Sequence, residues 1–282
     1  MAINNFIPTV WSEHLLTSLG KQYIAVANCN RDYEGEILGK GSSVKICGLN
    51  PITIGDYTKN TDIGAPQELS DRAFELTIDQ AKYFNFQIDD VERVQSSPNL
   101  MDLAIRTATE AIANDTDRYI YRLHKESGQM VHTLTDLHND ALYTKLLFIR
   151  EDFLNAGITN MSDIVLEVSP YVATELLRAK MDAVPTTETF ENGCIGSIAG
   201  MKVFVSPNIE CESDGQYVTS YCYMRSKRAI AFAEQFSEIE AYRPEKRFAE
   251  AVKGLHLYGA KIIYPSEFCV IQFQYDDTNE RV

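Results

Sequence analysis

Residues 97–128 read SPNLMDLAIRTATEAIANDTDRYIYRLHKESG and predict one long helix. Ser97 followed by Pro98 gives an N-cap oxygen and a pre-set first helical position, and Gly128 allows a left-handed exit at the other end. Apolar side chains recur on one arc at helical spacing, and polar side chains occupy the opposite arc. A helix of this length would span roughly 40 Å at 1.5 Å per residue. We therefore expect a rod along which other segments of the chain lie.

Residues 31–90 follow a different periodicity, in which apolar and polar side chains alternate. Val44 and Ile46 share one side of the first strand, and the return strand alternates in the same way. This period of two predicts an extended β-hairpin loop. Its outer part, residues 50–71, is polar and interrupted by Gly and Pro. Because an isolated hairpin is marginally stable in water, it needs a surface of the same molecule or of a neighbour to lie on.

The chain before residue 31 predicts an arm with one short amphipathic helix. Thr9 can cap this helix, apolar side chains recur at helical spacing after it, and Gly20 ends it. Trp11 has little preceding sequence to cover its ring. We expect Trp11 to find its apolar partner elsewhere in the fold or on a neighbouring molecule.

Helical and strand patterns alternate after the long helix. A second helix is predicted over residues 135–155, and an apolar strand at 163–168 leads into a helix that starts at Ser169 and Pro170. Alternation predicts five further strands, at residues 200–206, 217–224, 229–236, 248–265 and 268–274. We interpret residues 225–228 as a basic turn between two of these strands. The order of elements indicates a mixed α/β unit.

Composition and charge limit the function. The chain has 282 residues, of which 45% are hydrophobic, and a formal net charge of -14. It can bury a substantial core, and we expect two domains. The charge disfavours a protein that grips phosphate backbones, because such proteins use Lys and Arg to displace counterions. It does not exclude a protein that merely encloses nucleic acid.

Two patterns bear on the compartment. No stretch approaches 18 consecutive apolar residues and the first residues lack a signal-peptide pattern, so we expect a soluble protein without a membrane partner. No cysteine belongs to a CxxC pair, and a chain of this length does not need disulfides. We therefore expect reduced, mostly buried thiols. The six cysteines are Cys29, Cys47, Cys194, Cys211, Cys222 and Cys269.

The sequence contains no pattern typical of an active site. Residues 39–43 lack the spacing of a phosphate loop and lead into a strand, so we interpret them as a bend. The five histidines form neither an HExxH motif nor an i, i+4 pair. Asp89, Asp90 and Glu92 form an acidic cluster without the spacing of a Ca²⁺ site. We predict no catalytic residue, no cofactor and no metal, and a protein that is not an enzyme.

Two charged residues, Asp115 and Arg122, fall inside the apolar arc of the long helix. Burying either charge alone would be costly, so each needs a partner. The partner is either on another subunit, as an inter-subunit ion pair, or on a neighbouring part of the same chain. The sequence leaves both alternatives open.

Several segments, in their order along the chain, resemble the major capsid proteins of tailed bacteriophages, whose fold is shared with encapsulin shells. The resemblance covers the chain from about residue 6 to residue 274, and it rests on the ordered set of segments rather than on one motif. The segments are NCNRDYEGEILGKGSSVKI (28–46), DQAKYFNFQIDD (79–90), the long helix that starts at SPNL, GSIAGMKVFVSPNI (196–209), AIAFAEQ (229–235) and GLHLYGAKIIYP (254–265).

The resemblance implies an α+β fold with an N-terminal arm, an extended β-hairpin loop, a peripheral domain with a long spine helix, and a mixed α/β axial domain. The C-terminal strands, including 268–274, would return to the peripheral domain. The implied boundaries are 1–30 for the arm, 31–90 for the loop, 91–134 with 246–275 for the peripheral domain, 135–245 for the axial domain and 276–282 for a flexible tail.

The function that the resemblance implies is structural: pentamers and hexamers that close into an icosahedral shell around double-stranded DNA. Such a subunit would assemble in the host bacterial cytoplasm and remain in the virion. The sequence shows no long charged helical extension before the arm, so we expect a separate scaffolding protein, together with a portal. Some relatives cross-link a loop lysine, but nothing singles out Lys40, Lys45 or Lys59 for this role.

Two alternatives remain beside the capsid hypothesis. One is an encapsulin-like shell that stores a cargo enzyme, and the other is an acidic α/β enzyme that uses the Asp89 to Glu92 cluster. For the capsid hypothesis, we expect deletion of residues 51–70 to leave a folded subunit that does not assemble. The residues that we expect at contacts between subunits are Trp11, Tyr57, Thr58, Lys59, Asn60, Asp115 and Arg122.

Overall fold

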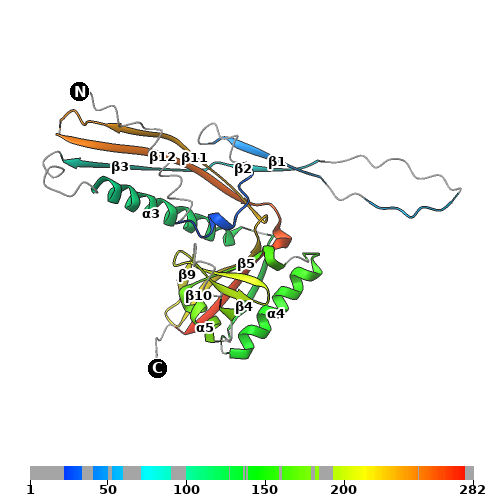
Figure 1. The fold of residues 1–282 in the computed structure, drawn as a ribbon. Helices are drawn as coiled ribbons and strands as arrows, with labels where there is room; N and C mark the ends of the chain where they lie inside the picture. The colour runs from blue at the N-terminus through cyan, green and yellow to red at the C-terminus, as the bar shows by residue number, and fades with distance from the viewer. Residues whose placement is uncertain are drawn as a thin grey trace.

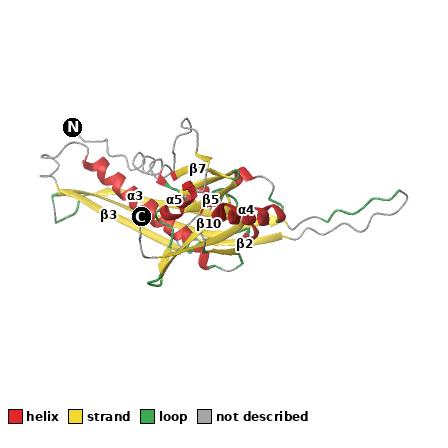
Figure 2. Ribbon diagram, turned by 90° about the horizontal axis from the view of Figure 1, so that it is seen from below, coloured by secondary structure: helices red, strands yellow, loops and turns green. Residues whose placement is uncertain are grey.

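The computed structural model describes residues 22–33, 41–49, 53–59, 71–89, 100–126, 128–135, 137, 139–158, 161–178, 182–183, 193–246 and 248–276. These residues form two units (Figure 1). The long unit combines a three-stranded sheet, a long helix and a β-hairpin, and the compact unit combines an eight-stranded sheet with two helices. Figure 2 shows the hairpin reaching past both units at one end of the molecule.

The long unit is built on one helix and three antiparallel strands. The helix is α3 (Leu100–Tyr121), and the strands follow the order β11 (Ile230–Tyr242), β12 (Ala249–Ile262) and β3 (Gln80–Asp89). The helix lies along one face of this sheet (Figure 1). Tyr119 of α3 meets Tyr258 of β12 edge to face, with 5.3 Å between the ring centroids. Such aromatic contacts fix the helix against the sheet.

The compact unit contains a mixed sheet covered by two helices. Its strands follow the order β4 (Met130–Leu134), β13 (Phe268–Asp276), β10 (Tyr217–Ser226), β5 (Ile164–Val168), β8 (Met201–Val205), β7 (Cys194–Ile198) and β6 (Asp182–Ala183), with β9 (Cys211–Ser213) also paired to β10. The helices are α4 (Asn139–Asn155) and α5 (Pro170–Arg178). Every residue of β5 is buried, as expected for a strand covered on both faces.

The hairpin consists of β1 (Ser43–Leu49) and β2 (Asp71–Thr77), paired antiparallel from Ser43 opposite Thr77 to Leu49 opposite Asp71. The predicted return strand is therefore two strands. Its first part, β2, closes the hairpin, and its second part, β3, pairs with β12 in the long unit instead. The two-stranded hairpin is shorter than the sequence alone predicts.

The long helix ends earlier than predicted, at Tyr121, and a 3₁₀ turn at Leu123–Lys125 follows. Side chains take up the carbonyl groups at its end. The Tyr223 hydroxyl donates to the Tyr121 carbonyl at 2.7 Å, and His124 Nδ1 lies 2.8 Å from the same oxygen. Because these groups replace the next helical turn as partners, the helix can stop there. Gly128 has the predicted left-handed φ of 101°, but it lies beyond the 3₁₀ turn.

The second helix begins at Asn139 rather than near residue 135. Residues Met130–Leu134 form the strand β4, which the sequence analysis missed and which pairs in parallel with β13. The strand at 268–274, expected in the peripheral domain, instead pairs with β10 and β4 in the compact unit. Its first four residues, from Phe268, are all buried. A strand that is apolar on both faces fits the interior of a sheet covered on both sides.

The predicted basic turn at residues 225–228 is also wrong in part. Arg225 lies in β10 and is fully buried, whereas Lys227 and Arg228 are exposed. Among the described residues, no helix is both long and apolar enough to cross a membrane.

Candidate functional site

The base of the hairpin is fixed by the chain's own sheet. Val44, Ile46, Leu76 and Ile78 of the hairpin region form a buried cluster with side chains of β11 and β12, namely Ala231, Ala233, Leu257 and Ile263. The backbones approach closely here, since a Cβ on Gly259 would lie 2.3 Å from the Thr77 carbonyl oxygen. The hairpin therefore finds support at its base within the same molecule, which the sequence left open.

The outer part of the hairpin differs sharply from its base. Residues 53–59 are all exposed, and they lie at the far end of the hairpin from both units (Figure 1). Ile54 is 93% exposed and Tyr57 is 74% exposed. Removing large apolar side chains from water lowers the free energy. On a projecting segment this requires a second surface that covers them.

Another exposed apolar surface lies on the outer face of the three-stranded sheet. Tyr83 of β3 stands opposite Leu255 of β12, and these side chains are 80% and 36% exposed. Leu255 points to the same face as Leu257, because side chains two apart in a strand share a face. The hairpin base covers Leu257. One half of this face is therefore covered by the chain itself, and the half toward Tyr83 is open.

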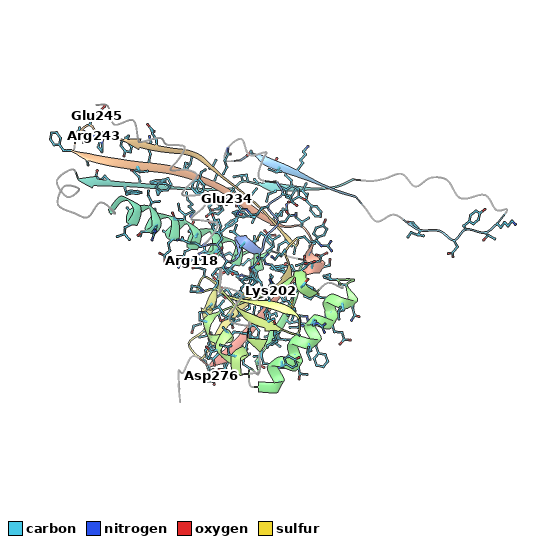
Figure 3. All side chains as sticks on the ribbon, in the orientation of Figure 1. Arg118, Lys202, Glu234, Arg243, Glu245 and Asp276 are labelled. Atoms are coloured by element: carbon cyan, nitrogen blue, oxygen red, sulfur yellow. The ribbon has the colours of Figure 1, made fainter. Side chains whose placement is uncertain are left out.

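The far end of the same sheet is polar and aromatic. Figure 3 labels Arg243 and Glu245 there, beyond the strands β11 and β12. Lys253 pairs with Glu240 at 2.7 Å and lies 5.3 Å from the Tyr242 ring centroid. These contacts at half-exposed positions stabilise the surface only weakly.

A buried ion pair holds the junction between the two units. The Arg225 guanidinium donates to both carboxylate oxygens of Glu167, at 3.1 and 3.0 Å. It also donates to the backbone carbonyls of Asn28 at 2.5 Å and Ala25 at 2.9 Å. The Asn28 amide completes the set with a hydrogen bond to Glu167 at 3.1 Å. Both charges are fully buried, so their hydrogen bonds offset the cost of removing them from water.

The same N-terminal segment is held by the long helix. Asp117 of α3 accepts hydrogen bonds from the backbone amides of Ile24, Ala25 and Val26 at 3.0, 3.1 and 3.2 Å. Burial raises the pKa of this carboxyl to about 7, although the three amides act to lower it. The Asp117 side chain therefore anchors residues 24–26 to the helix.

A third buried carboxylate, Glu234 of β11, ties the segment to the long sheet (Figure 3). It accepts hydrogen bonds from the Tyr23 hydroxyl at 2.6 Å and from Arg31 at 2.7 Å, and His256 Nε2 lies 2.9 Å away. Burial acts to raise the pKa of Glu234, but the contacts from His256, Tyr23 and Arg31 outweigh it and lower this pKa. Glu234 is thus held ionised by its donors.

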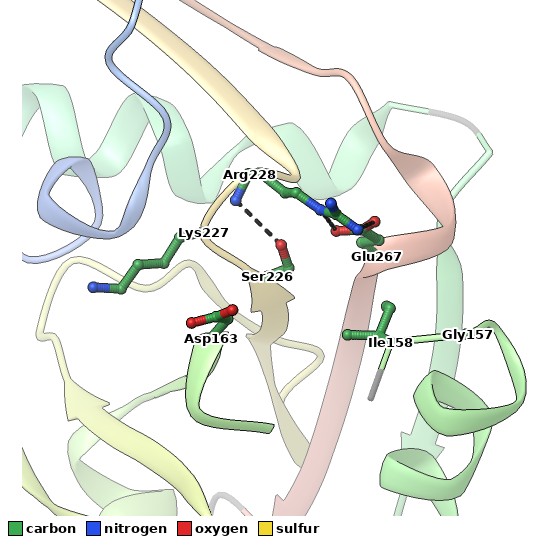
Figure 4. A pocket seen from close by; sticks show the side chains of 7 residues that line it. All are labelled: Gly157, Ile158, Asp163, Ser226, Lys227, Arg228 and Glu267. Atoms are coloured by element: carbon green, nitrogen blue, oxygen red, sulfur yellow. Dashed lines mark hydrogen bonds and ion pairs between the residues drawn. The ribbon is translucent and has the colours of Figure 1, made fainter. Parts of the chain in front are cut away.

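A depression of about 380 Å³ lies where the chain crosses between the units (Figure 4). Arg228 forms a two-pronged ion pair with Glu267 across it, at 2.7 and 2.5 Å. Gly157, Ile158, Asp163, Ser226 and Lys227 complete the lining. The opposed charges of the lining give this depression no net preference for an anion or a cation.

The structure places the predicted contact residues as follows. Tyr57, Thr58 and Lys59 are exposed on the hairpin, and Trp11 and Asn60 lie outside the described residues. Asp115 has partners on the same chain, which was one of the two alternatives; the other was a partner on another subunit. It accepts a hydrogen bond from Tyr258 at 2.8 Å and pairs with Lys82 at 3.4 Å. The Arg122 side chain is exposed. A role of these residues between subunits stays a prediction.

The remaining sequence predictions concern chemistry. Among the described residues, no three His, Cys, Asp or Glu side chains are grouped so that they could hold a metal ion. Asp89 lies at the end of β3, and Asp90 and Glu92 fall outside the described part of the chain. Cys29, Cys222 and Cys269 are buried free thiols, Cys194 is half-buried and Cys211 is exposed. The short helix predicted at residues 9–20 also lies outside the described residues.

The sequence analysis missed the buried charges that hold the junction. Glu167 is the one charged residue in the run 164–168, and Asp117 falls on the arc of the long helix that the sequence predicts to be polar. The one signal in the sequence for a buried ion pair is the charge of Glu167 within an otherwise apolar strand, because a buried carboxylate requires a partner.

Comparisons with known proteins agree on the fold. No family model matches the chain, and no curated protein matches it. A solved structure of Mycobacterium phage Che8 is 27% identical, covers 96% of this chain and 98% of its own, and superposes with a TM-score of 0.66. The capsid of Ralstonia phage GP4 is 12% identical, with 94% and 92% coverage and a TM-score of 0.66.

A virus-like particle from Pyrococcus furiosus is also similar, at 11% identity and a TM-score of 0.56, with coverage of 95% of this chain and 100% of that one. The chain has the α+β fold of the major capsid proteins of tailed bacteriophages.

Proposed function

We propose that the protein is the structural subunit of an icosahedral bacteriophage capsid that assembles into pentamers and hexamers around double-stranded DNA. One observation carries the proposal: the hairpin is buried against its own sheet at the base, and its outer residues 53–59 are exposed, with Ile54 at 93%. A segment of this kind lacks cover of its own and suits contact with another molecule. The similarity in fold to chains of phage capsids supports the same conclusion.

In this proposal, the outer hairpin residues of one subunit lie on the open half of the three-stranded sheet of the next subunit, around Tyr83 and Leu255. That surface continues the face that each subunit already covers with its own hairpin base. Tyr57 and Ile54 would supply the apolar area that the contact buries. Contacts between two different surfaces repeat head to tail and can close into rings, as pentamers and hexamers require.

The proposed partners follow from this role. The subunit binds copies of itself, a separate scaffolding protein and a portal, and it acts in the virion after assembly in the host bacterial cytoplasm. Its net charge of -14 suits a wall that encloses DNA without holding its phosphates. The proposed contacts between subunits include Trp11, Tyr57, Thr58, Lys59, Asn60, Asp115 and Arg122. The boundary of the N-terminal arm given above, 1–30, belongs to the same proposal.

Deletion of residues 51–70 tests the proposal. The hairpin base should still pack on β11 and β12, so the variant should fold with the wild-type unfolding transition. It should remain a monomer or small oligomer under conditions in which the wild-type protein forms particles, as measured by light scattering and electron microscopy. A matched control replaces residues 51–70 by a Gly/Ser linker of the same length, which preserves the loop but removes its side chains. Particles of wild-type size from both variants would refute the contact.

A second use of the same fold is an encapsulin-like shell around a cargo enzyme. The chain of the virus-like particle from Pyrococcus furiosus matches this chain over 100% of its own length, and this similarity supports the second candidate. The two candidates differ in content. Particles purified from a lysate after nuclease treatment should contain protected DNA if the shell is a phage capsid, and a second protein in fixed ratio if it stores cargo.

A further inference from the structure

The end of the long helix carries a polar cluster that the proposed shell does not require. His124 lies in the 3₁₀ turn after α3, and its side chain is 7% exposed. Its ring stacks on Tyr221 of β10, at 4.1 Å between centroids and 11° between planes. Glu210, in the connection between β8 and β9, faces the same ring, with its Oε2 atom 3.6 Å from His124 Nε2. The cluster therefore joins the helix of the long unit to the sheet of the compact unit.

The contacts fix which ring nitrogen carries a proton. His124 Nδ1 lies 2.8 Å from the carbonyl oxygen of Tyr121. A carbonyl oxygen only accepts hydrogen bonds, so Nδ1 must be the donor. In a neutral ring, Nε2 would then turn a lone pair toward the Glu210 carboxylate. In the charged ring, Nε2 carries a hydrogen and an attractive charge in the same place.

The contacts of Glu210 leave one of its carboxylate oxygens available to the ring. Glu210 Oε1 accepts from Lys125 at 2.8 Å, so this oxygen is already used. Glu210 Oε2 is buried and accepts no hydrogen bond among the described residues, which leaves it open to a donor at Nε2. The ring also lies just after the C-terminal end of α3, which is the negative end of the helix dipole.

The other groups around the ring do not compete for Nε2. The Tyr221 hydroxyl donates to Glu212 at 2.8 Å, away from the ring nitrogens. The Tyr223 hydroxyl accepts from the His124 backbone amide at 2.8 Å, and Gln129 donates to the His124 carbonyl at 2.9 Å. Glu210 is therefore the one described acidic group in contact with the imidazole.

We propose that His124 and Glu210 form a proton-controlled latch between the end of α3 and the β8 to β9 connection. The latch closes when the imidazole is protonated and opens when it is neutral, because the neutral ring presents a lone pair to the carboxylate. Closing it at acidic pH stiffens the joint between the two units. The backbone contacts of Tyr223 with residues 120–124 persist in both states, so opening frees the β8 to β9 connection without unfolding the helix end.

Hydrogen exchange on the purified full-length protein tests the latch. Exchange of peptides from residues 206–212 is followed by mass spectrometry at pH 5.5 and 8.0 and corrected for the intrinsic rate at each pH. Protection in the wild-type protein should fall about fivefold at the higher pH, in keeping with a partly buried cation at a helix end. The same protection at both values in the wild-type protein would overturn the proposal.

Two variants separate the latch from a general loss of stability. In Glu210→Gln, the amide oxygen can still accept from Lys125 while its NH₂ donates to a neutral Nε2, so the segment should be protected at pH 8.0. At pH 5.5 the charged ring and the NH₂ are both donors, so protection should not exceed that at pH 8.0, which reverses the wild-type dependence. In His124→Gln, protection of residues 206–212 should no longer depend on pH. It should remain at the low level that the wild-type protein shows at pH 8.0. A pH dependence that survives in both variants would refute the role of this pair.

Two further variants serve as controls for other titrating groups. His132 of β4 pairs with Asp152 of α4 at 3.2 Å rather than with Glu210, so His132→Gln should leave the exchange of residues 206–212 as in the wild-type protein. Asp117→Asn removes the carboxyl of α3 whose pKa lies near 7, and it should also leave the dependence intact. Loss of the dependence in Asp117→Asn would assign it to that carboxyl and overturn the latch.

Discussion

The junction between the units and the outer part of the hairpin are opposites. At the junction, Arg225 is a charged side chain with no exposed surface, and four hydrogen bonds from its guanidinium satisfy it within the molecule. On the hairpin, Ile54 is an apolar side chain with 93% of its surface in water. The first region is complete in a single chain, and the second is complete only in contact with another surface. Changes in the two regions should therefore damage different properties: stability at the junction and assembly at the hairpin.

The largest effect on stability is expected at the junction. Arg225→Met removes the cation and leaves the Glu167 carboxylate buried without its main partner. Breaking a buried pair in this way costs about 3 to 5 kcal/mol. The free energy of unfolding, measured by urea denaturation, should fall by that amount, and the yield of folded protein should drop.

Arg228→Met is the matched control for this variant, because Arg228 is three residues away and also pairs with a carboxylate. Its side chain is 64% exposed, and exposed pairs contribute about 1 kcal/mol or less. If Arg225→Met and Arg228→Met lower the free energy of unfolding by the same amount, burial does not distinguish the two ion pairs.

The next largest effect is expected at the base of the hairpin. Leu76 is fully buried in the cluster that joins the hairpin to β11 and β12, and Leu76→Ala should lower the free energy of unfolding by about 2 to 5 kcal/mol. Glu75→Ala, at the exposed neighbouring position, should change it by less than about 0.5 kcal/mol. A neutral Leu76→Ala variant would show that the hairpin base does not belong to the fold of the single chain.

The contribution of Asp117 to stability should depend on pH. Asp117 has its pKa raised by burial from 3.8 to about 7 in the folded chain. The folded state therefore holds a proton that the unfolded chain has lost between these values. The free energy of unfolding should fall as the pH rises from about 4 to about 7 and level off above, by at most about 1.4 kcal/mol per pH unit for one proton.

The measurement is urea denaturation of the wild-type protein and of Asp117→Asn across this range. The difference between the two curves isolates Asp117 from other titrating groups, because Glu234, whose pKa is lowered, is present in both. If the difference does not change between pH 4 and pH 7, the carboxyl has its ordinary pKa in the folded protein.

Local patterns predicted much of this fold. The apolar spacing around Ile105 and Ile112 indicated the long helix; Ile105 is buried and Ile112 is partly buried. The alternation at Val44 and Ile46 indicated the first hairpin strand. The end of the helix could not be predicted in the same way, because the partners of the Tyr121 carbonyl come partly from Tyr223, which is about one hundred residues further along the chain.

The buried charges show a second limit of the sequence. Arg225 next to Lys227 and Arg228 has the composition of a basic turn, and only the position of Glu167 across the sheet makes it a core residue. Glu167 and Asp117 need partners that distant segments supply. A pattern of single residues can indicate that a buried charge needs a partner, but it cannot identify that partner.

The smallest effect on stability, and the largest on assembly, is expected at the outer hairpin. Ile54→Ser combined with Tyr57→Ser should leave the free energy of unfolding of the single chain within about 0.5 kcal/mol of the wild type, because both side chains are exposed before and after the change. The same variant should form few or no particles in light scattering and electron microscopy, since the contact between subunits loses its apolar area. Tyr57→Phe keeps the ring and removes only the hydroxyl, so it should assemble as the wild type does. If the double variant is destabilised and still assembles, then residues 53–59 support the fold of their own chain, and the contrast with the junction is wrong.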